Sequence, residues 1–76
     1  MNLNDSLIKT TYQVVDVSDL ELPVERRLEA LGLTAGTNIT VLNKKKDGAV
    51  IVKVRGTRFA VGKQIAAGIH LKEAVQ

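Results

Sequence analysis

The chain has no cysteine and no tryptophan, and its 76 residues include one proline, one tyrosine and one phenylalanine. Without cysteine there is neither a disulfide framework nor a thiolate metal ligand, so packing alone must hold the fold together. With so few aromatic residues, the hydrophobic 45% of the chain must form an aliphatic core. The sequence therefore predicts one small domain, in which we expect no pocket of appreciable depth.

Long apolar segments are also missing. None approaches the roughly 18 to 20 residues that span a bilayer, and Met1–Asp5 lacks the basic start and apolar stretch of a signal peptide. We expect no membrane insertion and a cytoplasmic location. The net charge of +3, from eleven basic and eight acidic residues, allows an acidic partner but does not require one.

Groups that could carry chemistry are sparse. His70 is the only histidine, whereas transition-metal sites usually recruit several nitrogen or sulfur ligands. We expect His70 to face solvent, the alternative being a metal ligand completed by another chain. Because there is no Ser–His–Asp set and no glycine-rich phosphate loop, we expect no enzyme and no cofactor.

The segment after Pro23 predicts a helix over residues 24–31. Proline suits the first helical turn, where its missing N–H costs nothing. Gly32 is placed to end the helix with a positive φ, which residues with a Cβ resist. Three acidic residues spaced four apart could line one face of this helix, and we interpret them as solubilising charge rather than as a cation site: Glu21, Glu25 and Glu29.

A rigid corner is predicted directly after the helix. Leu33 can fold back onto Leu28, the contact that accompanies a Schellman-type helix end. Gly36 stands third in the four-residue segment Thr34–Thr37, which suits a type II turn. The corner would lead into a strand that begins near Asn38.

Five short strands are predicted from segments rich in β-branched residues: 12–17, 38–43, 49–55, 59–61 and 69–71. In the first, alternation places Tyr12, Val14 and Asp16 on one face and Val17 on the other. Asp47-Gly48 predicts a hairpin, because both residues tolerate positive φ. A second tight turn contains Gly56, and residues 62–68 predict a single helical turn.

These elements describe a mainly β fold, a small and strongly bent barrel of about five strands with one short helix inserted after the first strand. Residues 1–10 could be a short capped helix or a loosely attached arm. We divide the chain into an N-terminal arm over residues 1–10 and a barrel over residues 11–76.

Basic residues gather around one predicted hairpin: Lys44, Lys45, Lys46, Lys53, Arg55 and Arg58. A lysine-rich tip is usually a solvated turn that protects neighbouring strand edges. A contact surface for an acidic protein is the second interpretation. Nucleic acid is disfavoured, because Tyr12 and Phe59 are the only residues that could stack on bases.

Three motifs together resemble the FeoA family of small ferrous iron transport proteins: Arg27–Thr37 (RLEALGLTAGT), Ile39–Val41 and Val52–Gly56 (VKVRG). The match extends over about residues 12–73, and the same module is similar to the carboxy-terminal domain of iron-dependent repressors. The chain departs from the family pattern before the first strand, where Lys9-Thr10-Thr11 replaces an expected glycine.

The resemblance implies an SH3-like barrel that acts without catalysis as a cytosolic accessory of a membrane-bound FeoB-type GTPase, the importer of ferrous iron. We assign backbone geometry to four turn glycines: Gly32, Gly36, Gly48 and Gly56. We assign protein contact to residues of the corner and of the lysine tip: Arg27, Leu28, Leu31, Leu33, Lys44, Lys45 and Lys46. The alternative function is a metal-responsive regulatory or nucleic-acid-binding barrel.

Because the chain has no cysteine and one histidine, we predict no tight ferrous site in the isolated monomer. Anaerobic calorimetry with micromolar Fe²⁺ should show no stoichiometric heat of binding. A tight signal that His70→Ala abolishes would contradict this prediction.

Overall fold

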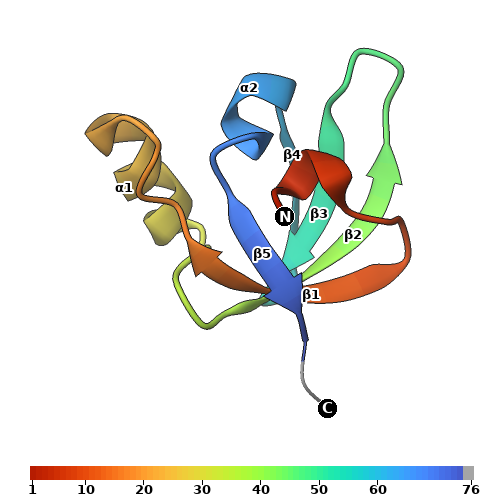
Figure 1. The fold of residues 1–76 in the computed structure, drawn as a ribbon, viewed down its shortest axis with the longest axis horizontal. Helices are drawn as coiled ribbons and strands as arrows, with labels where there is room; N and C mark the ends of the chain where they lie inside the picture. Colours follow the sequence, from red (N-terminus) through yellow and green to blue (C-terminus); the bar gives the residue numbers. More distant parts are fainter. Residues whose placement is uncertain (75–76) are drawn as a thin grey trace.

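One five-stranded antiparallel sheet forms the body of the protein, as seen in a computed structural model that describes residues 1–74 (Figure 1). The strands are β1 (Thr10–Asp16), β2 (Asn38–Lys44), β3 (Val50–Val54), β4 (Thr57–Val61) and β5 (His70–Glu73), in the spatial order β4-β3-β2-β1-β5. Helix α1 (Leu22–Ala30) follows β1, and the short α2 (Lys63–Ala66) follows β4. The mainly β fold with a helix inserted after the first strand is confirmed.

The core is aliphatic because the alternating residues of the strands turn one face of the bent sheet inward. Val41 on β2 pairs with Val52 on β3, and both side chains are fully buried. The core also receives Leu28 from α1 and Ile69 from the segment before β5. Tyr12 is buried as well, and its hydroxyl accepts a hydrogen bond from the backbone N–H of Leu7 at 2.9 Å.

Strand β1 departs from the predicted alternation near its end. The register between β1 and β5 shifts between Val14 and Asp16, which is the signature of a β-bulge. An extra residue in one strand reverses the face that later side chains occupy. Val17 is therefore buried with Val14, and the predicted placement of Val17 on the opposite face is wrong.

Helix α1 ends in a Schellman motif. The N–H of Leu33 donates to the carbonyl of Leu28 at 2.9 Å, and the N–H of Gly32 donates to the carbonyl of Glu29 at 2.9 Å. Gly32 has a φ of +91°. Glycine adopts this angle at little steric cost, and the angle allows these two hydrogen bonds to the last carbonyls of the helix. The predicted helix end is confirmed, although the helix begins two residues earlier than predicted, at Leu22.

The corner after the helix is also confirmed. The N–H of Thr37 donates to the carbonyl of Thr34 at 3.1 Å, and Gly36 has a φ of +88°, as a type II turn requires. The N–H of Gly36 then donates to the carbonyl of Val14 at 2.8 Å. The corner is therefore joined to β1 before β2 begins.

Three other turns contain residues with positive φ. In the β2–β3 hairpin only Gly48 has a positive φ; Asp47 instead accepts a hydrogen bond from the N–H of Ala49 at 3.0 Å. Arg55 leaves the strand that was predicted to contain it and takes a φ of +50° beside Gly56 at +80°, the geometry of a type I′ turn. Lys9, in the segment where the family pattern has glycine, takes a φ of +60°.

Residues at the amino end form a short capped 3₁₀ helix, η1 (Leu3–Asp5), rather than a loose arm. The side chain of Asn2 accepts a hydrogen bond from the N–H of Asn4 at 2.8 Å, and the carboxylate of Asp5 accepts one from the N–H of Asn2 at 3.1 Å. Leu3 is fully buried, and its N–H donates to the carbonyl of Ile69 at 3.0 Å. This helix packs onto the barrel.

Gly32→Val should destabilise the protein by roughly 1 to 2 kcal/mol or more, because a β-branched residue resists positive φ. A Cβ at this position would also lie 3.1 Å from Cδ of Arg55. Urea unfolding measures the change. Gly62→Ala is the matched control, since Gly62 has a φ of −64° and open space around it. An unchanged Gly32→Val midpoint would contradict the assigned helix end.

Candidate functional site

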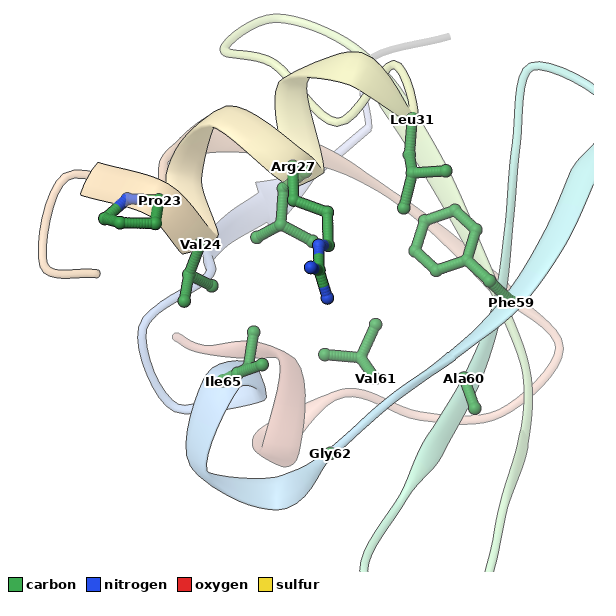
Figure 2. Close-up of a pocket in the computed structure, with 10 residues that line it drawn as sticks. Pro23, Val24, Arg27, Leu31, Phe59, Ala60, Val61, Gly62 and Ile65 are labelled. Atoms are coloured by element: carbon green, nitrogen blue, oxygen red, sulfur yellow. The ribbon is translucent and has the colours of Figure 1, made fainter. Parts of the chain in front are cut away.

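A mostly apolar groove of about 300 Å³ lies between α1 on one side and β4 with α2 on the other (Figure 2). One wall comes from α1 and the other from β4 and α2. The lining residues are Pro23, Val24, Arg27, Leu28, Leu31, Phe59, Ala60, Val61, Gly62 and Ile65. The domain therefore has an apolar groove on its surface, which the expectation of no pocket of appreciable depth did not anticipate.

The α1 wall follows from helical spacing. Val24, Leu28 and Leu31 recur at intervals of four and three residues, so they share one face of the helix. Leu28, in the middle, is buried and fastens the helix to the core. Leu31, at the end, stays 37% exposed at the edge of the groove. The helix thus presents an apolar face that the rest of the domain covers only in part.

Arg27 is the one ionisable residue among those that line the groove. Figure 2 shows its side chain extending from α1 into the space above Val61 and Ile65. Within residues 1–74, both ion pairs belong to His70, so no carboxylate lies within 4.0 Å of the Arg27 guanidinium. An arginine has five N–H donors in a planar fork, and here they are directed over apolar side chains without an anionic partner.

The structure separates the residues assigned to protein contact. Arg27, Leu28 and Leu31 meet in the groove. Leu33 is fully buried, so its assignment to a contact surface is wrong; it is part of the core because the Schellman motif turns it inward. The lysine tip, residues 44–46, is exposed and lies on the other side of α2 from α1 in Figure 1.

Sequence reasoning missed half of the groove. The sequence assigns Phe59 and Val61 to a strand and Ile65 to a helical turn, with no indication that the three form the wall opposite α1. The spacing of Val24 and Leu28 could have indicated an apolar helix face. No sequence signal connects that face with residues more than thirty positions later.

His70 does not simply face solvent. It is half-buried, with Nδ1 2.8 Å from Oδ1 of Asp16 and Nε2 3.2 Å from Oδ2 of Asp19. A neutral imidazole has one N–H and can donate to only one carboxylate at a time. Donation to both Asp16 and Asp19 requires the protonated ring, in which both nitrogens carry a hydrogen. These contacts tie β5 to the loop that leads into α1.

The contact with His70 lowers the pKa of the Asp16 carboxyl group. The hydrogen bond from His70, together with bonds from Ser18, holds the pKa of Asp16 below the ordinary 3.8. Both ring nitrogens of His70 are engaged by carboxylates. Within residues 1–74, no three His, Cys, Asp or Glu side chains are grouped so that they could hold a metal ion.

The sequence profile of the FeoA domain matches residues 1–73 of this chain. The chain belongs to the FeoA family. The described helices of this family member include none long and apolar enough to cross a membrane.

Similar proteins agree with the FeoA assignment. The chain is 23% identical to a candidate Fe(2+) transport protein A of Helicobacter pylori, covering 100% of this chain and 99% of the relative. The solution structure of the FeoA protein from Chlorobium tepidum has a TM-score of 0.89 and 28% identity, over 99% of this chain and 71% of that one. FeoA of Stenotrophomonas maltophilia, crystallised with zinc and described as a prokaryotic SH3 domain protein, has a TM-score of 0.81 and 29% identity, over 95% and 89% of the two chains. The fold is accordingly SH3-like.

We predict a pH-dependent effect of Asp16→Asn on stability. Because the folded-state pKa of Asp16 is lowered, its carboxylate stabilises the fold above the unfolded-state pKa, and this stabilisation is lost as the pH falls through the lowered value. The variant should therefore melt below the wild type near neutral pH, and the gap should close in acid below 3.8.

Thermal melts at a series of pH values test this, with Glu73→Gln as the control. Glu73 is exposed and forms no ion pair within residues 1–74. If the gap between wild type and Asp16→Asn stayed constant into acid, the contact with His70 would not carry the effect.

Proposed function

We propose that this FeoA-family protein is a non-enzymatic, cytoplasmic accessory of ferrous iron uptake. In this proposal it binds the cytosolic part of a FeoB-type transporter GTPase and modulates the transporter. The observation that carries the proposal is the groove, because residues of the family motif, Arg27 and Leu28, line it together with Leu31. The family's association with ferrous iron transport supplies the biological setting.

The shape and rigidity of the groove support a role in binding. Leu28 and Leu33 hold the carboxyl end of α1 in the core, and the Schellman motif fixes the direction in which the chain leaves it. A surface that is already ordered loses little conformational entropy when a partner docks. The groove is small, so the contact belongs at the low end of interface size, about 1,200 Å² or less in total, as in transient complexes.

The lysine tip is the proposed secondary contact. Lys45 and Lys46 are exposed, and Lys44 donates from its Nζ to the carbonyl of Asn4 at 2.9 Å, which steadies the base of the tip. Exposed like charges of this kind steer an acidic partner toward the surface more than they add affinity. The tip lies away from the groove, so the two surfaces can be tested separately.

The composition of the groove supports a role without catalysis. Its lining residues include one ionisable group, Arg27, and no side chain suited to act as a nucleophile or general base. The regulatory alternative lacks support of its own: α1 has nine residues and α2 has four, and the described chain has no second full-length helix to pair with α1 as a DNA-reading unit.

Binding to the purified cytosolic portion of the cognate FeoB-type transporter tests the proposal. We expect micromolar binding by wild type and a loss of about tenfold or more for Arg27→Ala combined with Leu31→Ala, since both side chains line the groove. Leu31 is preferred to Leu28 because truncating the buried Leu28 would cost about 2 to 5 kcal/mol of stability.

Lys44, Lys45 and Lys46 changed together to Ala form the comparison variant, and circular dichroism confirms that each variant is folded. We expect the lysine variant to weaken binding mainly at low salt. Absence of transporter binding by wild type, with nucleic acid recovered instead, would replace the proposal with the regulatory alternative. If only the lysine variant loses binding to the transporter, the contact lies at the lysine tip and not in the groove.

A further inference from the structure

We propose that the groove receives an acidic apolar peptide segment, in which one or two large apolar side chains flank an Asp or Glu whose carboxylate pairs with Arg27. The inference rests on the proposed function, since it names the chemistry of the segment by which a protein partner would dock. It follows from three properties of the groove: its lining, its size and its single unpaired charge.

The lining calls for apolar side chains. Apart from Arg27, every lining residue is aliphatic, aromatic, proline or glycine. Phe59 and Ile65 pack against the core yet remain partly exposed, and Leu31 is 37% exposed. Covering these side chains removes apolar surface from water, which is the main favourable term in association. A polar or glycine-rich segment would cover less of this apolar surface and would bind more weakly.

The volume of the groove suits one or two side chains of a partner better than a large ligand. The volume of about 300 Å³ is at the bottom of the range for small-molecule pockets. A space of this size accommodates one or two large side chains of a chain that lies across it. An apolar segment crossing the groove must also pass the guanidinium of Arg27, which extends into it (Figure 2).

The charge calls for a carboxylate. A segment that covered the groove would take Arg27 out of water, and an ion that loses its hydration without gaining a partner is strongly destabilised. Within residues 1–74 no carboxylate forms an ion pair with Arg27. The partner must therefore bring the anion. A carboxylate matches the planar guanidinium with two parallel hydrogen bonds.

Nucleic acid or free phosphate fits this groove less well. Backbone recognition of nucleic acid needs several cations along a track together with stacking platforms. The groove offers one arginine and one aromatic ring, Phe59, and the lysines gather elsewhere. A lone phosphate would leave the apolar lining exposed. A single carboxylate within an apolar segment satisfies both parts of the surface.

Phage display of random peptides of about twelve residues on the full chain tests the inference. We expect the selected peptides to share an Asp or Glu next to Leu, Ile, Met or Phe. A representative selected peptide and its Glu→Gln or Asp→Asn counterpart are then synthesised, and their affinities are measured by fluorescence anisotropy. Replacing the carboxylate should weaken binding about tenfold to a hundredfold, because a charge-assisted hydrogen bond is lost.

Protein variants locate the site. Arg27→Gln should reproduce the loss seen with the neutral peptide, and the two changes together should cost little more than either alone. Arg26→Gln is the matched control, since Arg26 is the neighbouring exposed arginine and does not line the groove; we expect less than about a twofold change for a charge outside the contact. Leu31→Ala should also lower the affinity for the peptide.

The inference is overturned if selection yields no peptides, if the selected peptides lack acidic residues, or if Arg27→Gln binds them as wild type does. The transporter's cytosolic portion is measured in parallel with wild type and Arg27→Gln. If wild type and Arg27→Gln bind the transporter portion equally well, the inference is overturned while the proposed function stands. Binding of acidic peptides at Arg27 without any binding of the transporter would overturn the proposed function alone.

Discussion

The end of α1 is the constraint on which the rest of the structure depends. The backbone bonds from Gly32 and Leu33 close the helix and turn Leu33 into the core beside Leu28. Positive φ at Gly32 makes this reversal possible and disfavours any residue with a Cβ. The side chain of Arg55 lies close over the glycine and would have to shift to admit a Cβ. Because the corner then bonds to β1 through Gly36, the helix, the first strand and the second strand are placed relative to one another within a few residues.

The other end of α1 is positioned by contacts from the far end of the chain. Leu20 lies over Gly68, where an added Cβ would come within 2.5 Å of its Cδ2. Beside it, Asp19 contacts His70. The loop into α1 is thus tied to β5 while the helix end is tied to the core. Between these attachments the helix leaves an apolar face partly uncovered, and β4 with α2 supplies the opposite wall.

The groove is therefore a consequence of how a small barrel accommodates an inserted helix. A chain of 76 residues buries only about 60% of the surface that its unfolded form exposes, and α1 contributes a single buried residue, Leu28. The apolar residues left at the edge are placed opposite Phe59 and Ile65, with Arg27 among them. The groove thus combines an apolar lining with one charge that forms no ion pair within residues 1–74, and this combination is the basis of the proposed docking of a protein partner.

The sequence by itself determined the elements that depend on local bonds. The Schellman end at Gly32, the type II turn at Gly36 and the alternation of Val50, Val52 and Val54 each involve residues within a few positions of one another, so propensity and spacing predict them. The assignment of Arg27, Leu28 and Leu31 to one contact surface came from the resemblance to the FeoA family, and the structure places all three along the groove.

The tertiary structure alone decided the bulge after Val14, the pairing of His70 with Asp16 across 54 positions, and the wall opposite α1. It also moved Leu33 from the expected surface into the core. These features depend on which distant strands pair and in which register. A shift of one residue exchanges the two faces of a strand, and the energy that selects the register comes from packing between segments far apart in the chain.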